Sequence, residues 1–230
     1  MTAVKLFAAL PKPDAVPAQQ FHDHWRHPHG TLAKRISLMR QYVQSHRIES
    51  PIAAVNDATF EGVTEVWYDS VADALGAGTE PAYARWLAPD EPNFVEPKKV
   101  VFLFAEEEVL SSRVRVTDYP SDADGDWSPW TTWLSVKLIQ LVMPSANPDW
   151  ASDEDAELGF SIGALRHVRS RPVPEIYAER SPKLAGVREL WWPTLSAFEA
   201  GVRRNPGALE TLLAKASDFH TLLGSAERVK

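Results

Sequence analysis

The feature that most constrains the fold of this chain is a repetition between its two halves. The tripeptide Val4–Leu6 returns unchanged at Val136–Leu138, each time at the head of an apolar stretch. The hexapeptide Gly62–Trp67 returns with two substitutions at Gly186–Trp191. A repeat this long exceeds the unit of a solenoid, and it indicates two related domains instead of an array of short modules.

The helical stretches that follow these motifs repeat a break in their middle. Three residues around this break recur with the same intervals between them: Gly76, Pro81 and Leu87 in the first half match Gly201, Pro206 and Leu212 in the second. Between the two halves the composition shifts to Asp, Pro, Ser and Gly, which is typical of an exposed linker. We therefore predict a first domain at residues 1–112, a linker at 113–131 and a second, degenerate domain at 132–230.

Hydrophobic periodicity and turn residues predict the same element order in both halves, β-α-β-β-α-β, which is that of the ferredoxin-like fold. In the first half we expect strands at 4–10, 39–49, 61–68 and 100–109, with helices beginning near Val16 and at Ser70. In the second half we expect strands near 133–143, 167–179, 186–192 and 219–229, and helices near 152–166 and up to 216. Helices cover only one face of such a sheet. The predicted fold class is therefore α+β, with two ferredoxin-like units fused in tandem and their sheets facing each other.

Composition excludes several classes of function. Lys and Arg total 24 against 31 Asp and Glu, a formal charge of -7 with no basic stripe, so neither nucleic acid nor an anionic membrane is an expected partner. The chain has no cysteine, which rules out disulfides and thiolate chemistry. No stretch approaches the roughly 20 apolar residues of a membrane span. We expect a soluble, cytoplasmic protein whose beginning is a first strand and not a signal peptide.

The segment from Phe21 to His46 is the first place to look for a functional site. Trp25 and His29 are four residues apart and therefore neighbours on one stripe of a helix, which Pro28 should kink just before His29. Tyr42, Gln44 and His46 alternate along a strand and must share one face. A helix or the partner sheet lying over this face can bring the two histidines into one pocket.

Imidazole titrates near neutral pH, so His29 and His46 are candidates for a general acid and base. Tyr42 is a candidate hydrogen-bond donor to a developing oxyanion. The alternative for all three is a purely structural role in packing or surface hydrogen bonding. Trp67 has the same two interpretations, as a pocket wall or as core.

Two clusters suggest a metal site only superficially. On a helix His22, His24, His27 and His29 do not converge, and no acidic ligand accompanies them at a typical spacing. Asp122, Asp124 and Asp126 resemble a calcium loop but lack its closing glutamate, and we interpret them as linker. We predict that the protein holds no metal.

The residues of the 21–46 segment, together with Asp90, Glu91 and Phe94, resemble the EthD family of the dimeric α/β-barrel superfamily. The resemblance covers residues 4–110 well and residues 133–229 only in outline. It implies a small cyclic, aromatic or lactone-like substrate and chemistry without a metal or organic cofactor. It also implies that His29 and His46 are the acid–base pair and that Tyr42, Asp90 and Glu91 occupy further recurring positions.

The second half departs from this pattern. The helix near 152–166 has no Trp-x-x-x-His sequence, and Tyr177 and Glu179 stand near the place of Gln44 and His46. The acidic pair is reduced to Asp218. We therefore expect one working pocket, in the first half, with a structural second half.

Taken together, the sequence predicts a cofactor-independent lyase or isomerase that acts on a small hydrophobic cyclic or aromatic metabolite. The catalytic candidates are His29, His46 and Tyr42, and the substrate-binding candidates are Trp25, Gln44, Trp67, Asp90 and Glu91. The alternative is a non-catalytic binding or accessory protein of the same fold, which needs a cavity but no titrating pair. A cofactor-free oxygenase or a haem protein, both known elsewhere in the superfamily, is a further alternative. The fused halves form an intrachain pseudo-dimer, so a homodimer is possible but not needed to complete the fold.

Overall fold

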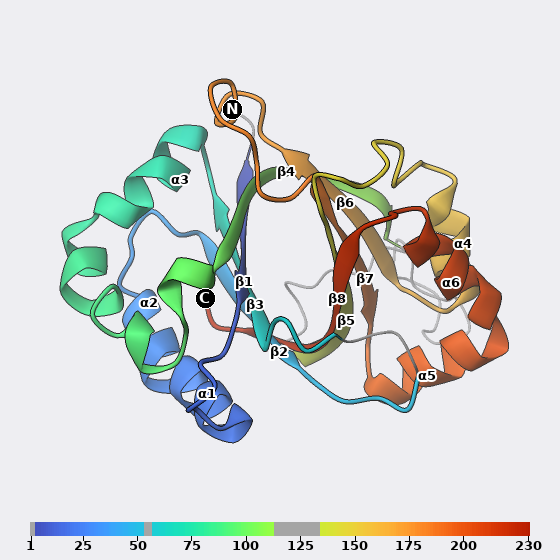
Figure 1. Ribbon diagram of the computed structural model, residues 1–230, viewed down its shortest axis with the longest axis horizontal. Helices are drawn as coiled ribbons and strands as arrows, with labels where there is room; N and C mark the ends of the chain where they lie inside the picture. The colour runs from blue at the N-terminus through green and yellow to red at the C-terminus, as the bar shows by residue number, and fades with distance from the viewer. Residues whose placement is uncertain (1–2, 53–56, 113–133) are drawn as a thin grey trace, which may run out of the picture.

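A computed structural model of the chain describes residues 3–52, 57–112 and 134–230 (Figure 1). The first half contains β1 (Val4–Leu10), α1 (Ala18–His24), α2 (Gly30–Ala33), β2 (Gln41–Arg47), β3 (Gly62–Tyr68), α3 (Val71–Gly76) and β4 (Val101–Ser112). The second half contains β5 (Leu134–Val142), α4 (Asp155–Ser161), β6 (Arg166–Pro172), β7 (Gly186–Trp192), α5 (Leu195–Arg204), α6 (Pro206–Ala214) and β8 (Phe219–Arg228). Short helical turns at Trp25–His29, Ala77–Thr79, Tyr83–Leu87, Glu91–Asn93 and Pro97–Lys99 complete the first half. Both halves therefore have the predicted order of strands and helices.

The eight strands form one closed antiparallel barrel. Within the first half the strand order is β4-β1-β3-β2, and within the second half it is the equivalent β8-β5-β7-β6. The two sheets face each other and also join at their edges, through β2 with β8 and β4 with β6. Closure pairs both edges of every strand that the structure describes, so none of these strands is left open for pairing with another chain. The predicted fold class, two fused ferredoxin-like units, is confirmed.

Helices cover the barrel on two opposite sides (Figure 1). The first-half helices α1, α2 and α3 lie on one side, and α4, α5 and α6 lie on the other. Each strand therefore has one face toward the barrel interior and one toward its own helices. In β1, Phe7 and Ala9 point inward, where they join a core cluster with Ile139 and Leu222 of the other half.

The barrel interior also holds a buried ion-pair ring made by the repeated motifs. Lys5 Nζ lies 3.0 Å from Glu65 Oε2 and 2.6 Å from Glu189 Oε2. Lys137 pairs with Glu65 and lies 3.0 Å from Glu189 Oε1. All four side chains are 0–1% exposed. The repeated Val-Lys-Leu and Gly-Val-x-Glu sequences thus place two lysines and two glutamates in contact at the centre of the barrel.

Local sequence explains how the first-half helices begin and break. Ser70 accepts a hydrogen bond from the Asp73 backbone N–H at 3.1 Å, the predicted cap of α3. Helix α1 continues past Trp25, but His27 leaves the helical region (φ −160°, ψ 118°) at the residue before Pro28. The predicted break is therefore confirmed, and α2 starts directly after His29.

Two expectations for the second half are wrong. Helix α4 ends at Ser161, well before Arg166, which already belongs to β6. Strand β6 ends at Pro172 and does not reach Glu179, because prolines at 172 and 174 cannot continue the hydrogen-bonded ladder. Tyr177 and Glu179 therefore belong to the loop between β6 and β7.

Among the described residues, no helix has the length and apolar character that crossing a membrane requires. The predicted linker at 113–131, with its three aspartates, lies outside the described residues.

Candidate functional site

The structure contains a cavity of about 500 Å³ between the first-half sheet and its helices. Its floor is the outward face of β1 and β3, including Leu6, Ala8 and Val66. Its walls include Trp25, His29 and Tyr42, three of the predicted site residues. This volume falls within the range of clefts that hold small organic ligands.

His29 is the imidazole that lines this cavity, and a carboxylate holds it in place. Its Nδ1 lies 2.9 Å from Asp90 Oδ2, while the other oxygen of Asp90 lies 2.9 Å from His24 Nε2. Since an ionised carboxylate only accepts hydrogen bonds, His29 carries a proton on Nδ1. Its Nε2 has no hydrogen-bond partner in the part of the chain that the structure describes. Asp90 therefore fixes the tautomer that presents an unprotonated nitrogen.

Burial and hydrogen bonding shift the titration of this pair. Burial lowers the pKa of His29 below its usual value of 6.5, although the hydrogen bond to Asp90 opposes the shift. For Asp90 burial acts in the opposite direction, but hydrogen bonds from His29 and His24 hold the pKa of this carboxyl below its ordinary range. At neutral pH the site therefore holds a neutral imidazole beside a carboxylate, the arrangement of a general base with an orienting anion.

Tyr42 is buried in the cavity wall, and its hydroxyl accepts two hydrogen bonds. Trp25 Nε1 donates to its hydroxyl at 3.0 Å, and Gln44 Nε2 donates to it at 2.9 Å. These two donors occupy both lone pairs of the phenolic oxygen, so its proton is left for the Thr64 hydroxyl or for a ligand. Burial raises the pKa of Tyr42 to about 12, which keeps that proton in place.

Glu91 also lines the cavity, and Tyr83 donates to its Oε1 at 2.9 Å. Burial raises the pKa of Glu91, with Asp90 adding to the effect. The predicted acidic pair is thus divided: Asp90 binds the histidines and Glu91 faces the ligand space.

His46 does not line the cavity, contrary to the prediction that it shares a pocket with His29. The Trp25 indole lies beside it, at 4.4 Å between ring centroids, and closes the cavity on that side. His46 is 1% exposed, and its Nε2 lies 3.1 Å from Gln44 Oε1. It therefore supports Gln44, which in turn holds Tyr42.

Trp67 is also outside the cavity, because it shares the inward face of β3 with Glu65. Its ring lies 4.2 Å from Lys5 Nζ inside the barrel. Gln44 is fully buried and does not line the cavity. Of the eight predicted residues, Trp25, His29, Tyr42 and Glu91 line the cavity, and Asp90 and Gln44 hold residues that do.

Strand registers identify the second-half counterparts of the site. In the first half, β2 and β3 pair Tyr42 with Val66 and Gln44 with Thr64. In the second half, β6 and β7 pair His167 with Leu190 and Arg169 with Arg188 at the equivalent positions. The counterpart of Tyr42 is therefore His167, and that of Thr64 is Arg188. This corrects the expectation that Tyr177 and Glu179 occupy the place of Gln44 and His46.

The space that is a cavity in the first half is filled in the second. Trp192, Phe198 and Leu212 are buried side by side in the core there, and Trp192 Nε1 donates to the Ile162 carbonyl at 3.0 Å. Helix α5 packs so closely that a Cβ on Gly201 would lie 1.8 Å from the same carbonyl oxygen.

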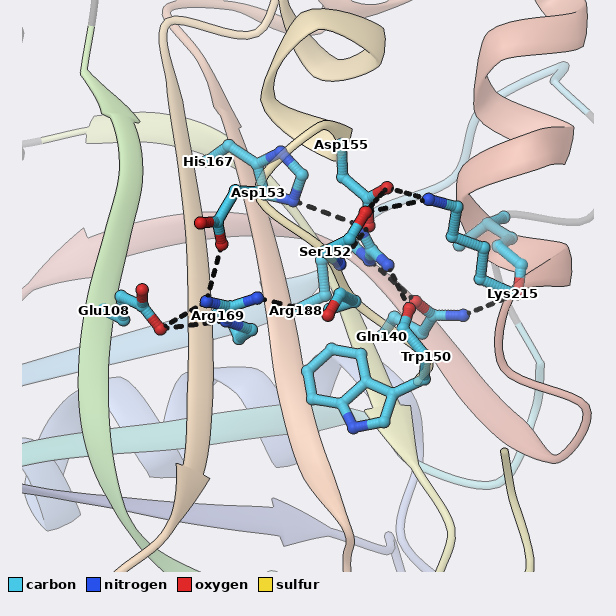
Figure 2. A network of polar contacts seen from close by, with 12 residues as sticks. Glu108, Gln140, Trp150, Ser152, Asp153, Asp155, His167, Arg169, Arg188 and Lys215 are labelled. Carbon is cyan, nitrogen blue, oxygen red and sulfur yellow. Dashed lines mark hydrogen bonds and ion pairs between the residues drawn. The ribbon is translucent and has the colours of Figure 1, made fainter. Parts of the chain in front are cut away.

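A polar network completes the filling (Figure 2). Arg188 Nη1 donates to Asp155 Oδ2 at 2.8 Å, and Lys215 pairs with the other oxygen of Asp155. Arg188 also donates to the Trp150 carbonyl at 2.6 Å and to Gln140 Oε1 at 3.1 Å. Burial and the Arg188 charge lower the pKa of His167 to about 3, so this histidine stays neutral. The second-half site is therefore occupied by a buried ion-pair cluster.

Sequence reasoning missed the residues that the second half contributes to the first-half cavity. Tyr177, Arg180, Ser181 and Lys183, all in the β6–β7 loop, line it. No local pattern signals this contribution, because it depends on the pairing of β4 with β6 at the sheet junction. Within the described residues, no group of three or more His, Asp or Glu side chains is arranged to hold a metal ion.

An eight-stranded barrel made of two fused ferredoxin-like units, with a cavity under one set of helices, defines a dimeric α/β-barrel protein. Residues 13–98, within the first half, match the EthD domain. No curated protein matches the sequence.

Two solved structures illustrate the likeness. An anthrone oxidase-like protein is 8% identical with a TM-score of 0.55, and the match covers 100% of this chain and 92% of that one. An ethyl tert-butyl ether d (EthD) family protein from Bacillus halodurans is 23% identical with a TM-score of 0.39, and it covers 46% of this chain and 99% of that one. At these identities the full-length match shows the fold alone.

Proposed function

We propose that this protein is an enzyme that moves a proton on a small cyclic or aromatic substrate bound in the first-half cavity, as a lyase or isomerase that needs no cofactor. The observation that carries the proposal is His29, which lines an apolar cavity with its Nδ1 on Asp90 and its Nε2 unpartnered among the described residues. A pure binding site requires a cavity but not an oriented base. The carboxylate–imidazole pair therefore favours the enzyme over the accessory protein.

In the proposed reaction His29 Nε2 removes a proton from a carbon that is next to a substrate carbonyl or conjugated with it, so that the negative charge moves onto the carbonyl oxygen. The imidazolium that forms is stabilised by Asp90, which already accepts the Nδ1 proton. The proton then returns to a different atom of the substrate in an isomerisation, or assists the departure of a leaving group in an elimination. In either case the enzyme returns to its starting protonation state.

Tyr42 supports this step by donating a hydrogen bond to the oxygen on which negative charge develops. Its own lone pairs already accept from Trp25 and Gln44, so its proton is the group left to meet the substrate, which competes for it with the Thr64 hydroxyl. Hydrogen bonds of this kind strengthen in a site that excludes water. Gln44 and His46 are then positioning residues: His46 binds Gln44 Oε1, and this leaves the amide nitrogen for Tyr42.

The proposal is tested with anthrone, a flat tricyclic ketone whose C10 protons exchange through its enol tautomer. In D2O, ¹H NMR follows the loss of the C10 signal, which reports proton removal directly. We expect His29→Gln to slow the catalysed exchange by about 10²–10⁴-fold. Tyr42→Phe should slow it by about 10²–10³-fold, since it removes one oxyanion donor.

The matched control is His27→Gln, because His27 is exposed and bonds to Thr31 instead of the cavity residues. This variant should catalyse the exchange of the anthrone C10 protons at the wild-type rate. Binding without catalysed exchange, for anthrone and for further cyclic ketones, would support the accessory-protein alternative. Exchange that survives His29→Gln would refute the assigned base. Oxygen uptake with formation of anthraquinone and water would keep His29 as base but make the protein an oxygenase, because one atom of O2 enters the product and the other leaves as water.

A further inference from the structure

The loop between β6 and β7 extends from the second half toward the strands of the first half (Figure 1), and four of its residues line the first-half cavity. Two hydrogen bonds fix it to β4: the Val173 N–H donates to the Phe104 carbonyl at 3.0 Å, and the Phe104 N–H donates to the side-chain hydroxyl of Tyr177 at 3.0 Å. Val173 and Ile176 are buried in the first-half core cluster. The loop is therefore an integral part of the cavity wall.

The exposed lining residues show where the cavity meets solvent. They are Gly78, Pro97, Phe102, Arg180, Ser181 and Lys183. The two charged residues among them, Arg180 and Lys183, are both cationic and both come from this loop. The chain as a whole has a formal charge of -7, so a purely cationic mouth runs against its average composition.

Neither cation is neutralised within the part of the chain that the structure describes. Arg180 Nε donates to the Ile176 carbonyl at 3.2 Å, and its guanidinium carbon lies 5.4 Å from the Tyr177 ring centroid. These contacts orient the guanidinium but leave its two terminal amino groups without a described partner. Lys183 Nζ has no described ion pair or hydrogen bond. Glu91, the carboxylate in the cavity lining, already accepts from Tyr83.

The rest of the cavity wall is largely apolar, with Leu6, Ala8, Leu87 and Phe94 in its lining. A ligand that fits both parts has an apolar ring system and one anionic group at the end near the mouth. A guanidinium presents paired N–H groups that match the two oxygens of a carboxylate.

We propose that the substrate is a cyclic or aromatic carboxylate, whose ring lies in the first-half cavity and whose carboxylate is bound at the mouth by Arg180 and Lys183 of the second half. The orientation of the ring toward His29 rests on the proposed function, whereas recognition of the carboxylate does not. The second half then determines specificity for a site whose chemistry lies entirely in the first.

Two probes of nearly the same shape test the proposal, 2-naphthoate and its uncharged amide, 2-naphthamide. Isothermal titration calorimetry of the full chain in low salt should show that the naphthoate binds at least about tenfold more tightly, as expected for one charge-assisted contact. Raising the salt concentration should reduce this preference, because exposed charges are screened.

The variant Arg180→Gln/Lys183→Gln should lose the preference by weakening naphthoate binding about tenfold and leaving naphthamide binding unchanged. The control is Arg203→Gln/Arg204→Gln in α5, which removes the same charge on the opposite side of the barrel from the first-half helices (Figure 1). This control should still bind naphthoate more tightly than naphthamide, as the wild type does. A loss of this preference in the loop variant would then not be explained by the change in net charge alone. Far-ultraviolet circular dichroism and thermal melting confirm that each variant is folded, and Lys183→Gln alone gives a smaller change in the same direction.

A wild-type protein that binds the two probes equally, or binds neither, would overturn the proposal. So would a loop variant that keeps the preference for naphthoate. The proposed base is tested independently: the loop variant should still catalyse exchange on uncharged anthrone, whereas His29→Gln should lose exchange and keep the naphthoate preference. Failure of one proposal is thus distinguishable from failure of the other.

Discussion

Replacing Lys137 by Met tests how much the buried ion-pair ring contributes to the stability of the barrel. The ammonium of Lys137 pairs with Glu65 and Glu189 and lies 3.6 Å from the centroid of the Trp191 ring. Methionine keeps most of the alkyl stem, so the loss is mainly one charge. Lys5 then remains as the one lysine of the ring beside two fully buried carboxylates.

Removing one member of a buried ion pair typically costs about 3–5 kcal/mol, because the remaining charge stays desolvated. We expect a loss in this range for Lys137→Met, measured as the free energy of unfolding in urea at pH 7. The double variant Lys137→Met/Glu65→Gln restores the balance of one lysine and one glutamate within the ring. The double variant should therefore lose less free energy of unfolding than the two single variants lose together, by about 0.5–3 kcal/mol.

The comparison is an exposed pair on the same protein. Arg40 and Asp69 have side chains that are 62% and 56% exposed, and exposed pairs of this kind contribute about 0–1 kcal/mol. Asp69→Asn should therefore change stability little. A cost for Lys137→Met below about 1 kcal/mol, or a double variant that costs the full sum of its parts, would refute the view that the ring is a coupled unit.

The pH dependence of the ring has a defined sign. Burial alone would raise the pKa of Glu65, but Lys137 and Lys5 outweigh it and hold the pKa below its usual value of 4.5. A carboxyl with a depressed pKa contributes stability that is present above about pH 4.5 and is lost as the pH falls below that value. The stability difference between the wild type and Glu65→Gln should therefore shrink in acid.

Three further predictions concern packing, the base and the second half. Gly62→Ala should destabilise the protein by about 1–3 kcal/mol in urea unfolding, because the new Cβ would lie 2.2 Å from the Trp25 ring. Burial lowers the pKa of His29, so the rate of anthrone exchange should rise with pH through a midpoint below 6.5, and a midpoint above it would contradict an unprotonated His29 as base. Asp155→Asn should lower the melting temperature, since it weakens the buried pair with Arg188, and should leave the exchange rate of the folded protein unchanged.

Much of the fold could be predicted from the sequence because the repeated motifs serve the barrel itself. Lys5 and Lys137 meet the two glutamates of the repeated hexapeptides in the barrel interior. The glycines that open these hexapeptides, Gly62 and Gly186, are each covered by a tryptophan ring. Residues that pack in the barrel in this way repeat at recognisable spacing. The end of α4 depends on tertiary packing instead, and its predicted position near Arg166 is wrong.

The candidate site was predictable only where a local pattern decides the direction of a side chain. Alternation along β2 places Tyr42, Gln44 and His46 on one face, as the structure shows. It does not reveal that Trp25 closes the cavity between His46 and His29. The same alternation, applied to β3, would have placed Trp67 with Glu65 inside the barrel, so this error was avoidable.

The two halves share a scaffold but differ in the outward-facing residues that decide whether a cavity exists. The scaffold positions correspond closely, since Gly62 packs on Trp25 as Gly186 packs on Trp150. At an outward position of the third strand, however, Thr64 in the first half corresponds to Arg188 in the second.

A buried arginine needs partners, and Asp155, Gln140 and the Trp150 carbonyl surround it (Figure 2). This network and the close packing of α5 fill the place that corresponds to the first-half cavity. The outward-facing residues of the second half therefore serve its own packing. Its β6–β7 loop nevertheless lines the first-half cavity, so the filled half contributes to the wall of the neighbouring cavity.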